Sequence, residues 1–315
     1  MEPAACSWCE EPIEGPARQM GDRPYCGECY SRALRNRRGV WWASLVAVLV
    51  QVTFVVGVAL LAGATHPHLQ GWSLVLAGVV LSLVPAVVWL VLFYLQDVRE
   101  PEPKGLVLSV FVLGALLARA VGMPLVNEVF NAPRWLATAP IYNVLGAILV
   151  VGFTQQFLVY AAVRFSIYPS AEFNERVDGM VYATAAALGY ATMLNVQYVV
   201  DSGGLSLVSG VIRITVTALA LASCGGLSGY FLGRCKFERV PLWWMPAGLT
   251  LAAVLDGLFT YVRGEITTTA ISLKGGGYNP WPGLVLGAAV AGATFGILFY
   301  LVRRLEQRAP QATGA

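Results

Sequence analysis

The sequence has very few histidines and few charged side chains of any kind. Only two of its 315 residues are histidine, His66 and His68, and 12% of the residues are charged. An ordinary soluble domain carries about 25% charged residues, so this composition excludes one. Because 57% of the residues are hydrophobic and the mean hydropathy is +0.64, we expect the chain to lie in a membrane.

Eight stretches are long and apolar enough to cross a bilayer as a helix, which takes about 20 residues. They are residues 40–63, 72–95, 105–125, 141–165, 179–200, 206–233, 241–262 and 283–302. A β-barrel would need short alternating segments, whereas Ala43 to Leu61 is apolar on every face. We therefore predict an all-α polytopic membrane protein of about eight transmembrane helices, with a membrane domain at 39–304 and a disordered tail at 305–315.

Positive charge gathers in every second connector between these stretches. Arginine or lysine is concentrated before the first span, in the connectors 96–104, 164–178 and 234–240, and in the tail. Such a bias marks the cytoplasmic side of a membrane protein, and eight spans then place both termini in the cytoplasm. The net charge of +3 comes without a basic patch interleaved with aromatics, so no nucleic-acid partner is expected.

Four cysteines form two pairs in the N-terminal segment. Cys6 and Cys9 are separated by two residues, as are Cys26 and Cys29. This spacing is typical of a tetrahedral zinc site. The alternative is a pair of disulfides, but the cytoplasmic side keeps thiols reduced. We predict a cytoplasmic zinc-binding module at residues 1–38 that is similar to zinc-ribbon or treble-clef modules, which bind partner proteins.

Three places in the membrane region share a pattern with one protein family. Asp97 to Pro103 is an acidic connector spaced by prolines, Asp178 to Tyr198 is a span that opens on Asp-Gly and ends on Asn and Tyr, and Leu227 to Gly233 is a span end rich in small residues. In these places the chain resembles the PrsW family of intramembrane proteases, over about residues 90 to 262. The resemblance implies a helical protease fold in the bacterial inner membrane, with lipid and membrane-protein substrates as partners.

The same resemblance shows which positions should carry the chemistry. The family's paired glutamates fall on Gln155 and Gln156, its later glutamate falls on Leu194, and its two histidines fall on Leu221 and Asp256. Hydrolysis needs a group that takes a proton from water and a ligand or acid that stabilises the oxyanion. Amides and aliphatic side chains can do neither, so no catalytic residue is expected to be intact and no catalytic metal to be bound.

We therefore predict a pseudoprotease that binds or regulates membrane proteins, with a structural zinc ion in its N-terminal module. Two alternatives remain: an active intramembrane protease in which Asp256 and altered residues support hydrolysis, and a small-solute transporter. The stretch Gly226 to Gly229 fits a serine-protease motif, but no predicted span supplies the imidazole that such a serine needs. Small residues there are more typical of close helix packing.

Charged and amide side chains inside the spans should face the protein interior. A charge at mid-membrane costs roughly 2.5–3.5 kcal/mol on insertion scales. We therefore expect Arg119, Arg213 and Asp256 to face the bundle interior. Arg213 should pair with Asp256, and the amides of Gln155, Gln156 and Asn195 should form a hydrogen-bonded network.

Overall fold

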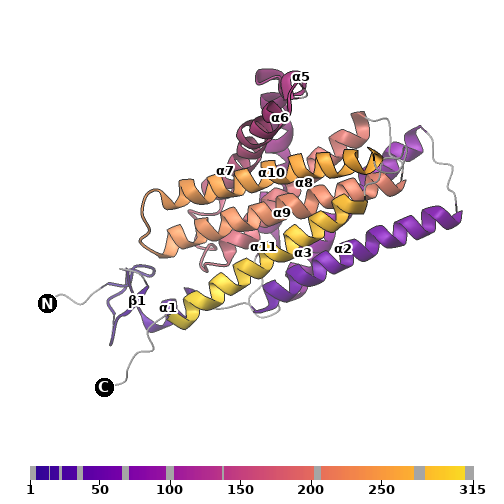
Figure 1. Cartoon of the computed structure of the whole chain (residues 1–315). Coiled ribbons are helices and arrows are strands. Elements are labelled where there is room, and N and C mark those ends of the chain that lie inside the picture. The colour runs from indigo at the N-terminus through magenta and orange to yellow at the C-terminus, as the bar shows by residue number, and fades with distance from the viewer. Residues whose placement is uncertain are drawn as a thin grey trace.

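The computed structural model describes most of the chain. The described residues are 5–13, 15–20, 23–33, 38–65, 71–96, 103–136, 138–201, 207–272 and 281–308. The acidic connector at 97–102, both histidines, and the residues after 308 therefore lie outside the described residues. Among the described residues, helices run side by side in one bundle, and two short strands with one short helix lie at one end of it (Figure 1).

The N-terminal module is built from a β-hairpin and a helix. Strands β1 (Arg18–Met20) and β2 (Arg23–Tyr25) pair antiparallel, with Arg18 opposite Tyr25. Helix α1 (Gly27–Ala33) follows directly, so the second cysteine pair lies at the junction of strand and helix. Such a small unit buries little apolar surface, and a fold of this size normally needs a cross-link or a metal.

In the described residues the membrane region consists of helices joined by turns and short connectors, without a strand. Its elements are α2 (Arg38–Thr65), α3 (Trp72–Gln96), α4 (Lys104–Leu117), the π-helical turns η1 (Ala118–Gly122) and η2 (Leu125–Val129), α5 (Ala132–Leu136), α6 (Pro140–Gly146), the π-helical turn η3 (Ala147–Gly152), α7 (Phe153–Ser166), α8 (Asp178–Asp201), α9 (Leu207–Phe237), α10 (Trp244–Ser272) and α11 (Trp281–Arg308). Helix α11 thus continues four residues past the expected domain boundary at 304.

Seven helical segments in the described part of the chain are long and apolar enough to cross a membrane. They correspond to seven of the eight predicted spans, which confirms an all-α membrane fold. The remaining stretch forms α8, which is not among the seven. Residues 178–192 of α8 are all buried, including Tyr182 and Leu188, which have no exposed surface. Helix α8 is therefore covered by other helices, and small and polar residues replace the apolar ones that lipid contact would require.

Glycine brings α10 against the segment that carries the two glutamines. A Cβ atom at Gly152 would collide with the carbonyl oxygen of Ala253, and one at Gly257 would collide with the backbone of Ile148. The two glycines therefore let η3 and the start of α7 lie in backbone contact with α10. The π-helical turn η3 ends directly before α7, and such turns often occur next to functional sites. This packing places the first turn of α7 beside Asp256.

Candidate functional site

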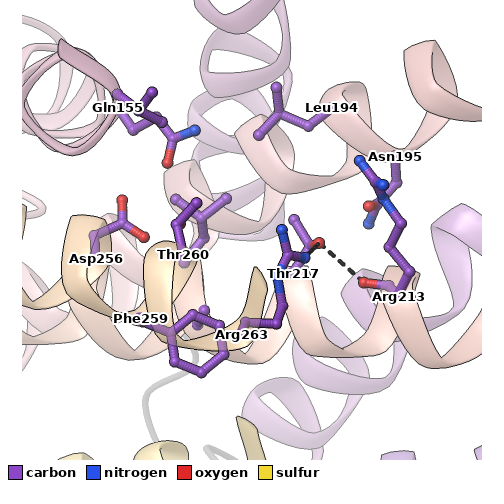
Figure 2. Close-up of a pocket in the computed structure, with 12 residues that line it drawn as sticks. Gln155, Leu194, Asn195, Arg213, Thr217, Asp256, Phe259, Thr260 and Arg263 are labelled. Carbon is purple, nitrogen blue, oxygen red and sulfur yellow. Dashed lines mark hydrogen bonds between the residues drawn. The ribbon is translucent and has the colours of Figure 1, made fainter. Parts of the chain in front are cut away.

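A cavity of about 190 Å³ lies between α7, α8, α9 and α10 (Figure 2). Its lining residues are Val151, Gln155, Leu194, Asn195, Arg213, Thr217, Ala220, Leu221, Asp256, Phe259, Thr260 and Arg263. Four of the five positions singled out from the sequence, Gln155, Leu194, Leu221 and Asp256, are therefore brought to one place from four helices.

The fifth position, Gln156, contacts the cavity through Asp256. Its Nε2 donates a hydrogen bond of 3.1 Å to Oδ2 of Asp256, and both side chains are buried, with 0% and 2% of their surface exposed. Because an amide is neutral, this bond satisfies one carboxylate oxygen without supplying a charge or a transferable proton. The pair thus stabilises a buried acid and offers no second acid or base.

Two expected contacts inside the bundle are wrong. Arg213 does not pair with Asp256; its guanidinium carbon lies 3.4 Å from the centre of the Tyr198 ring. The amides do not form one network either, since Asn195 donates to the backbone carbonyl of Ile214 at 3.1 Å and Gln156 donates to Asp256. Arg213, Asn195 and Gln156 each find a partner on an adjacent helix instead, which the chain order alone does not reveal. Arg119, which was expected to face the bundle interior, is exposed.

Arg263 lines the cavity although it lies one residue beyond the predicted span 241–262. Its Nη1 donates to Oγ1 of Thr217 at 3.4 Å. The sequence did carry a signal: Asp256, Thr260 and Arg263 are spaced by four and three residues, which places them on one face of a helix. Extending the span beyond residue 262 would have put Arg263 in the same cavity as Asp256.

The four cysteines of the N-terminal module form a site that can hold a metal ion. The sulfur atoms of Cys6, Cys9, Cys26 and Cys29 all lie within 4.8 Å of one another, and none is in a disulfide. The backbone N–H of Cys26 donates to Sγ of Cys6 at 3.3 Å, and that of Cys29 donates to Sγ of Cys26 at 3.4 Å. Burial raises the pKa of Cys6, but hydrogen bonds from backbone N–H groups outweigh it and lower that pKa to about 6. Burial and the neighbouring thiols raise the pKa of Cys29. Cys6 is therefore the cysteine of this set whose surroundings favour the thiolate, which is the form that binds metal.

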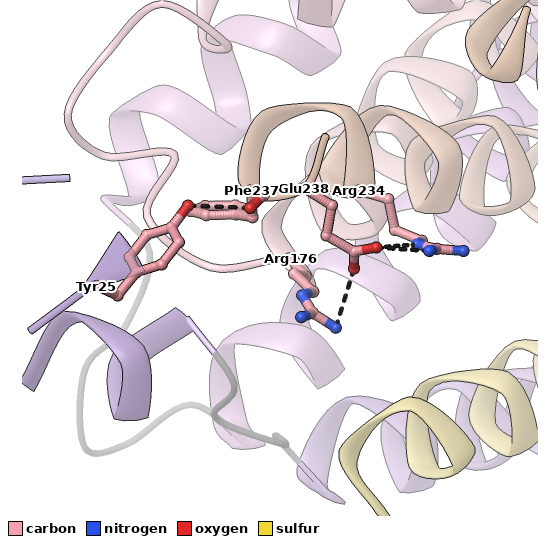
Figure 3. A network of polar contacts seen from close by, with 5 residues as sticks. All are labelled: Tyr25, Arg176, Arg234, Phe237 and Glu238. Carbon is pink, nitrogen blue, oxygen red and sulfur yellow. Dashed lines mark hydrogen bonds and ion pairs between the residues drawn. The ribbon is translucent and has the colours of Figure 1, made fainter. Parts of the chain in front are cut away.

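The module lies against the end of α9. The hydroxyl of Tyr25 donates to the backbone carbonyl of Phe237 at 3.0 Å (Figure 3), and the Trp8 ring stacks on the Phe237 ring with centroids 5.3 Å apart. Nζ of Lys236 lies 5.4 Å from the centre of the Trp8 ring. These contacts join residues more than 200 positions apart and fix the cysteine site against the bundle.

An ion-pair network lies beside the contact between the N-terminal module and the end of α9. Glu238 lies between two arginines: its Oε1 is 3.2 Å from Nη1 of Arg176, and its Oε2 accepts from Nε of Arg234 at 3.0 Å (Figure 3). Burial lowers the pKa of Arg176, and the neighbouring Glu238 opposes that shift. Because these side chains are largely buried, salt screens the pairs only weakly. The network holds the loop before α8 against the end of α9, where the module docks.

The small residues near the end of α9 serve helix packing, as predicted. Gly229 meets the backbone of Gly179, and Gly233 meets the backbone of Arg176, so closely that neither could carry a Cβ atom. The hydroxyl of Ser228 donates to the carbonyl of Gly225 at 2.9 Å in its own helix. The serine hydroxyl is therefore bound within its own helix, next to Gly229, which makes the close α8–α9 contact.

Comparison with known proteins identifies the family of the membrane region. The model of the PrsW family of intramembrane metalloproteases matches residues 102–275. The chain belongs to this family. It is 32% identical over 195 residues to Protease PrsW of Geobacillus kaustophilus, covering 61% of this chain and 80% of that protein. It is 28% identical over 187 residues to Protease PrsW of Bacillus subtilis, covering 58% and 80%. No solved structure matches.

The match to the PrsW family covers the cavity and leaves out the cysteine module. All twelve lining residues lie within 102–275, whereas Cys6 to Cys29 precede that range. The resemblance read from the motifs at 178–198 and 227–233 is thereby confirmed. The module is a feature that this chain has in addition to the PrsW region.

The family's description as metalloproteases calls for a metal, and the cavity lining does not fit one. A catalytic zinc site takes three protein ligands, usually from histidine, cysteinate and carboxylate. The lining of the cavity, as the structure describes it, offers one carboxylate, Asp256, and no histidine, glutamate or cysteine. One carboxylate with neutral amides and hydroxyls cannot hold a catalytic zinc ion. Among the described residues, the side chains that are grouped closely enough to hold a metal ion are the four cysteines of the module.

Proposed function

We propose that this chain is a non-catalytic member of the PrsW family that binds a transmembrane segment of another protein and does not cut it. The observation that supports this proposal most is the convergence of Gln155, Leu194, Leu221 and Asp256 on one cavity. The resemblance to the family assigns its acids and histidines to these positions, and on that assignment we infer that the site keeps its place in the bundle while the side chains that would activate water are replaced.

The rival within the same family is a protease with altered chemistry. Asp256 is the one residue on which it would depend, because it is the single carboxylate in the cavity lining. A general base must reach the attacking water, and a second group must stabilise the oxyanion. Gln156 already donates to Asp256, and the part of the cavity lining that the structure describes contains no second acid. Binding without hydrolysis is therefore the better supported function.

Photo-crosslinking separates the two functions. A photoreactive amino acid in place of Leu194, in the cavity, should form adducts with single-span membrane proteins of full length. The same amino acid in place of Leu251, which is 44% exposed on α10 and does not line the cavity, is the matched control and should not form them. Adducts that end within the membrane span, and that disappear on Asp256→Ala, would instead establish the altered protease.

We also infer that the module binds one structural zinc ion through Cys6, Cys9, Cys26 and Cys29. Four thiolates fill a tetrahedral shell, which leaves no position for a water or a substrate. Bound zinc would supply the folding free energy that this small unit lacks. Metal analysis of the purified protein should find one zinc ion per chain, and none after Cys26→Ser. A protein that is folded and metal-free as purified would contradict the assignment.

We further propose that the module and the C-terminal end of α11 lie in the cytoplasm of a bacterial cell, with α2 to α11 in the inner membrane. The distribution of arginine and lysine between alternate connectors supports this orientation. A fluorescent-protein fusion after Arg308 should fluoresce and a periplasmic alkaline phosphatase fusion there should be inactive. The opposite pair of results would reverse the orientation.

A further inference from the structure

The cavity carries more positive than negative charge. Arg213 from α9 and Arg263 from α10 line it, whereas Asp256 is its one acid. Arg263 acts electrostatically on Asp256 and donates to Thr217. If Arg263 balances Asp256, the charge of Arg213 is left without compensation inside the cavity.

The surroundings of Arg213 supply no counter-ion. Its guanidinium stacks over Tyr198 at 3.4 Å, and its backbone carbonyl accepts a hydrogen bond from Thr217 at 2.9 Å. Among the described residues, no carboxylate lies within ion-pairing distance of it. It lies six residues into α9, or about 9 Å along the helix. A charge at such a position is costly in a membrane protein and usually marks a site for a partner of opposite charge.

The size and lining of the cavity limit what that partner can be. A cavity of about 190 Å³ has room to admit a side chain of a neighbouring helix. The cavity has apolar walls from Leu194, Leu221 and Phe259, and polar groups from Asn195 and Arg213. An acidic side chain has the matching character, because a short methylene stem ends in a carboxylate.

We propose that the cavity recognises an aspartate or glutamate within a transmembrane segment of the partner, through an ion pair between its carboxylate and Arg213. This inference rests on the proposed function and names the feature of the segment that is bound. A guanidinium and a carboxylate form strong charge-assisted hydrogen bonds. A carboxylate buried in a partner's span is as unfavourable alone as the guanidinium of Arg213. Because the ion pair stabilises both charges, the cavity should prefer a span that carries an acid.

The test uses the full-length protein in phosphatidylcholine nanodiscs and synthetic single-span peptides. Three leucine- and alanine-rich peptides carry one glutamate at successive helical turns, and each has a twin with glutamine at the same place. Dissociation constants are measured by fluorescence energy transfer. The best glutamate peptide should bind at least about tenfold more tightly than its glutamine twin, the effect expected for a hydrogen-bonded charge pair.

Substitutions identify the residue responsible. Arg213→Gln should reduce the preference for glutamate to about twofold or less, while Arg213→Lys, which keeps the charge and checks that the bundle is intact, should retain part of it. Arg119→Gln is the matched control, because Arg119 is exposed on η1 and does not line the cavity. It should leave the preference unchanged.

Each other outcome contradicts a specific claim. Equal binding of both twins would overturn the ion pair and leave the proposed binding function standing. Failure of every peptide to bind the unmodified protein would contradict the proposed function itself. If phosphatidylglycerol in the nanodisc displaces the glutamate peptide, and Arg213→Gln abolishes that displacement, then the occupant is a lipid phosphate and the proposal is wrong.

Discussion

The cysteine module and the membrane cavity are two sites of the same chain with opposite chemical content. The module places four sulfur atoms within 4.8 Å of one another. The cavity also brings together residues from four helices, but in its described lining the one strong metal ligand is the carboxylate of Asp256. Convergence of side chains therefore does not by itself establish chemistry. The residue types decide it, and here they favour metal binding at one site and recognition at the other.

The largest loss of stability is expected when a zinc ligand of the module is removed. Structural zinc contributes on the order of 10–16 kcal/mol in small zinc-binding peptides, so Cys26→Ser should unfold the module. We expect rapid proteolysis between residues 5 and 33 and no bound zinc. Cys224→Ser is the control, because Cys224 is buried in α9 and lies outside the cysteine set. If the Cys26→Ser module resists proteolysis like the original, a metal is not what holds it together.

The cavity offers a matched pair of glutamines for the second test. Gln156→Leu removes the donor to buried Asp256 and should lower the free energy of unfolding by about 1.5–3 kcal/mol, as expected for a bond to a charged group. Gln155→Leu changes the same atoms in a side chain that lines the cavity, and should cost less than about 1 kcal/mol. Thermal unfolding in detergent measures both. Equal losses would mean that the bond to Asp256 has no special role.

Removing one hydrogen bond between the module and the bundle should have the smallest effect on stability. Tyr25→Phe keeps the ring and removes the hydroxyl that donates to Phe237, at an expected cost of about 0.5–1.5 kcal/mol. The exposed Tyr142 gives a control, since Tyr142→Phe should be nearly neutral. Faster amide exchange in the last turn of α9 would locate the loss. Unchanged exchange there would indicate that the module does not depend on this contact.

Properties that depend on neighbouring residues in sequence were predicted well. Long apolar runs predict spans because a helix satisfies its own backbone in lipid, and two close cysteine pairs predict a metal site because a short turn brings two sulfurs together. The span 179–200 shows the limit of this reasoning, since α8 is a core helix whose small and polar residues are covered by protein.

Contacts between distant residues were not predictable in the same way. The bond from Gln156 to Asp256 joins residues 100 positions apart, and that from Tyr25 to Phe237 joins residues 212 positions apart. Nothing in the local pattern specifies either partner, because helix packing decides it. Four of the five positions taken from the family motifs line one cavity, and the fifth, Gln156, donates to Asp256. The expectation that buried charges pair gave Arg213 the wrong partner, and the predicted span 241–262 ended one residue before Arg263.

Cleavage of a single-span reporter in proteoliposomes supplemented with zinc tests the central claim most directly, using a reporter that Protease PrsW of Geobacillus kaustophilus cuts under the same conditions. We expect the present chain to cut it at less than about 1% of that rate, since loss of a general base alone costs 10²–10⁴-fold. Gln155→Glu with Gln156→Glu should not restore cleavage, because Leu194 and Leu221 still provide no ligand. Cleavage by the unmodified chain that is lost on Asp256→Ala would contradict the account.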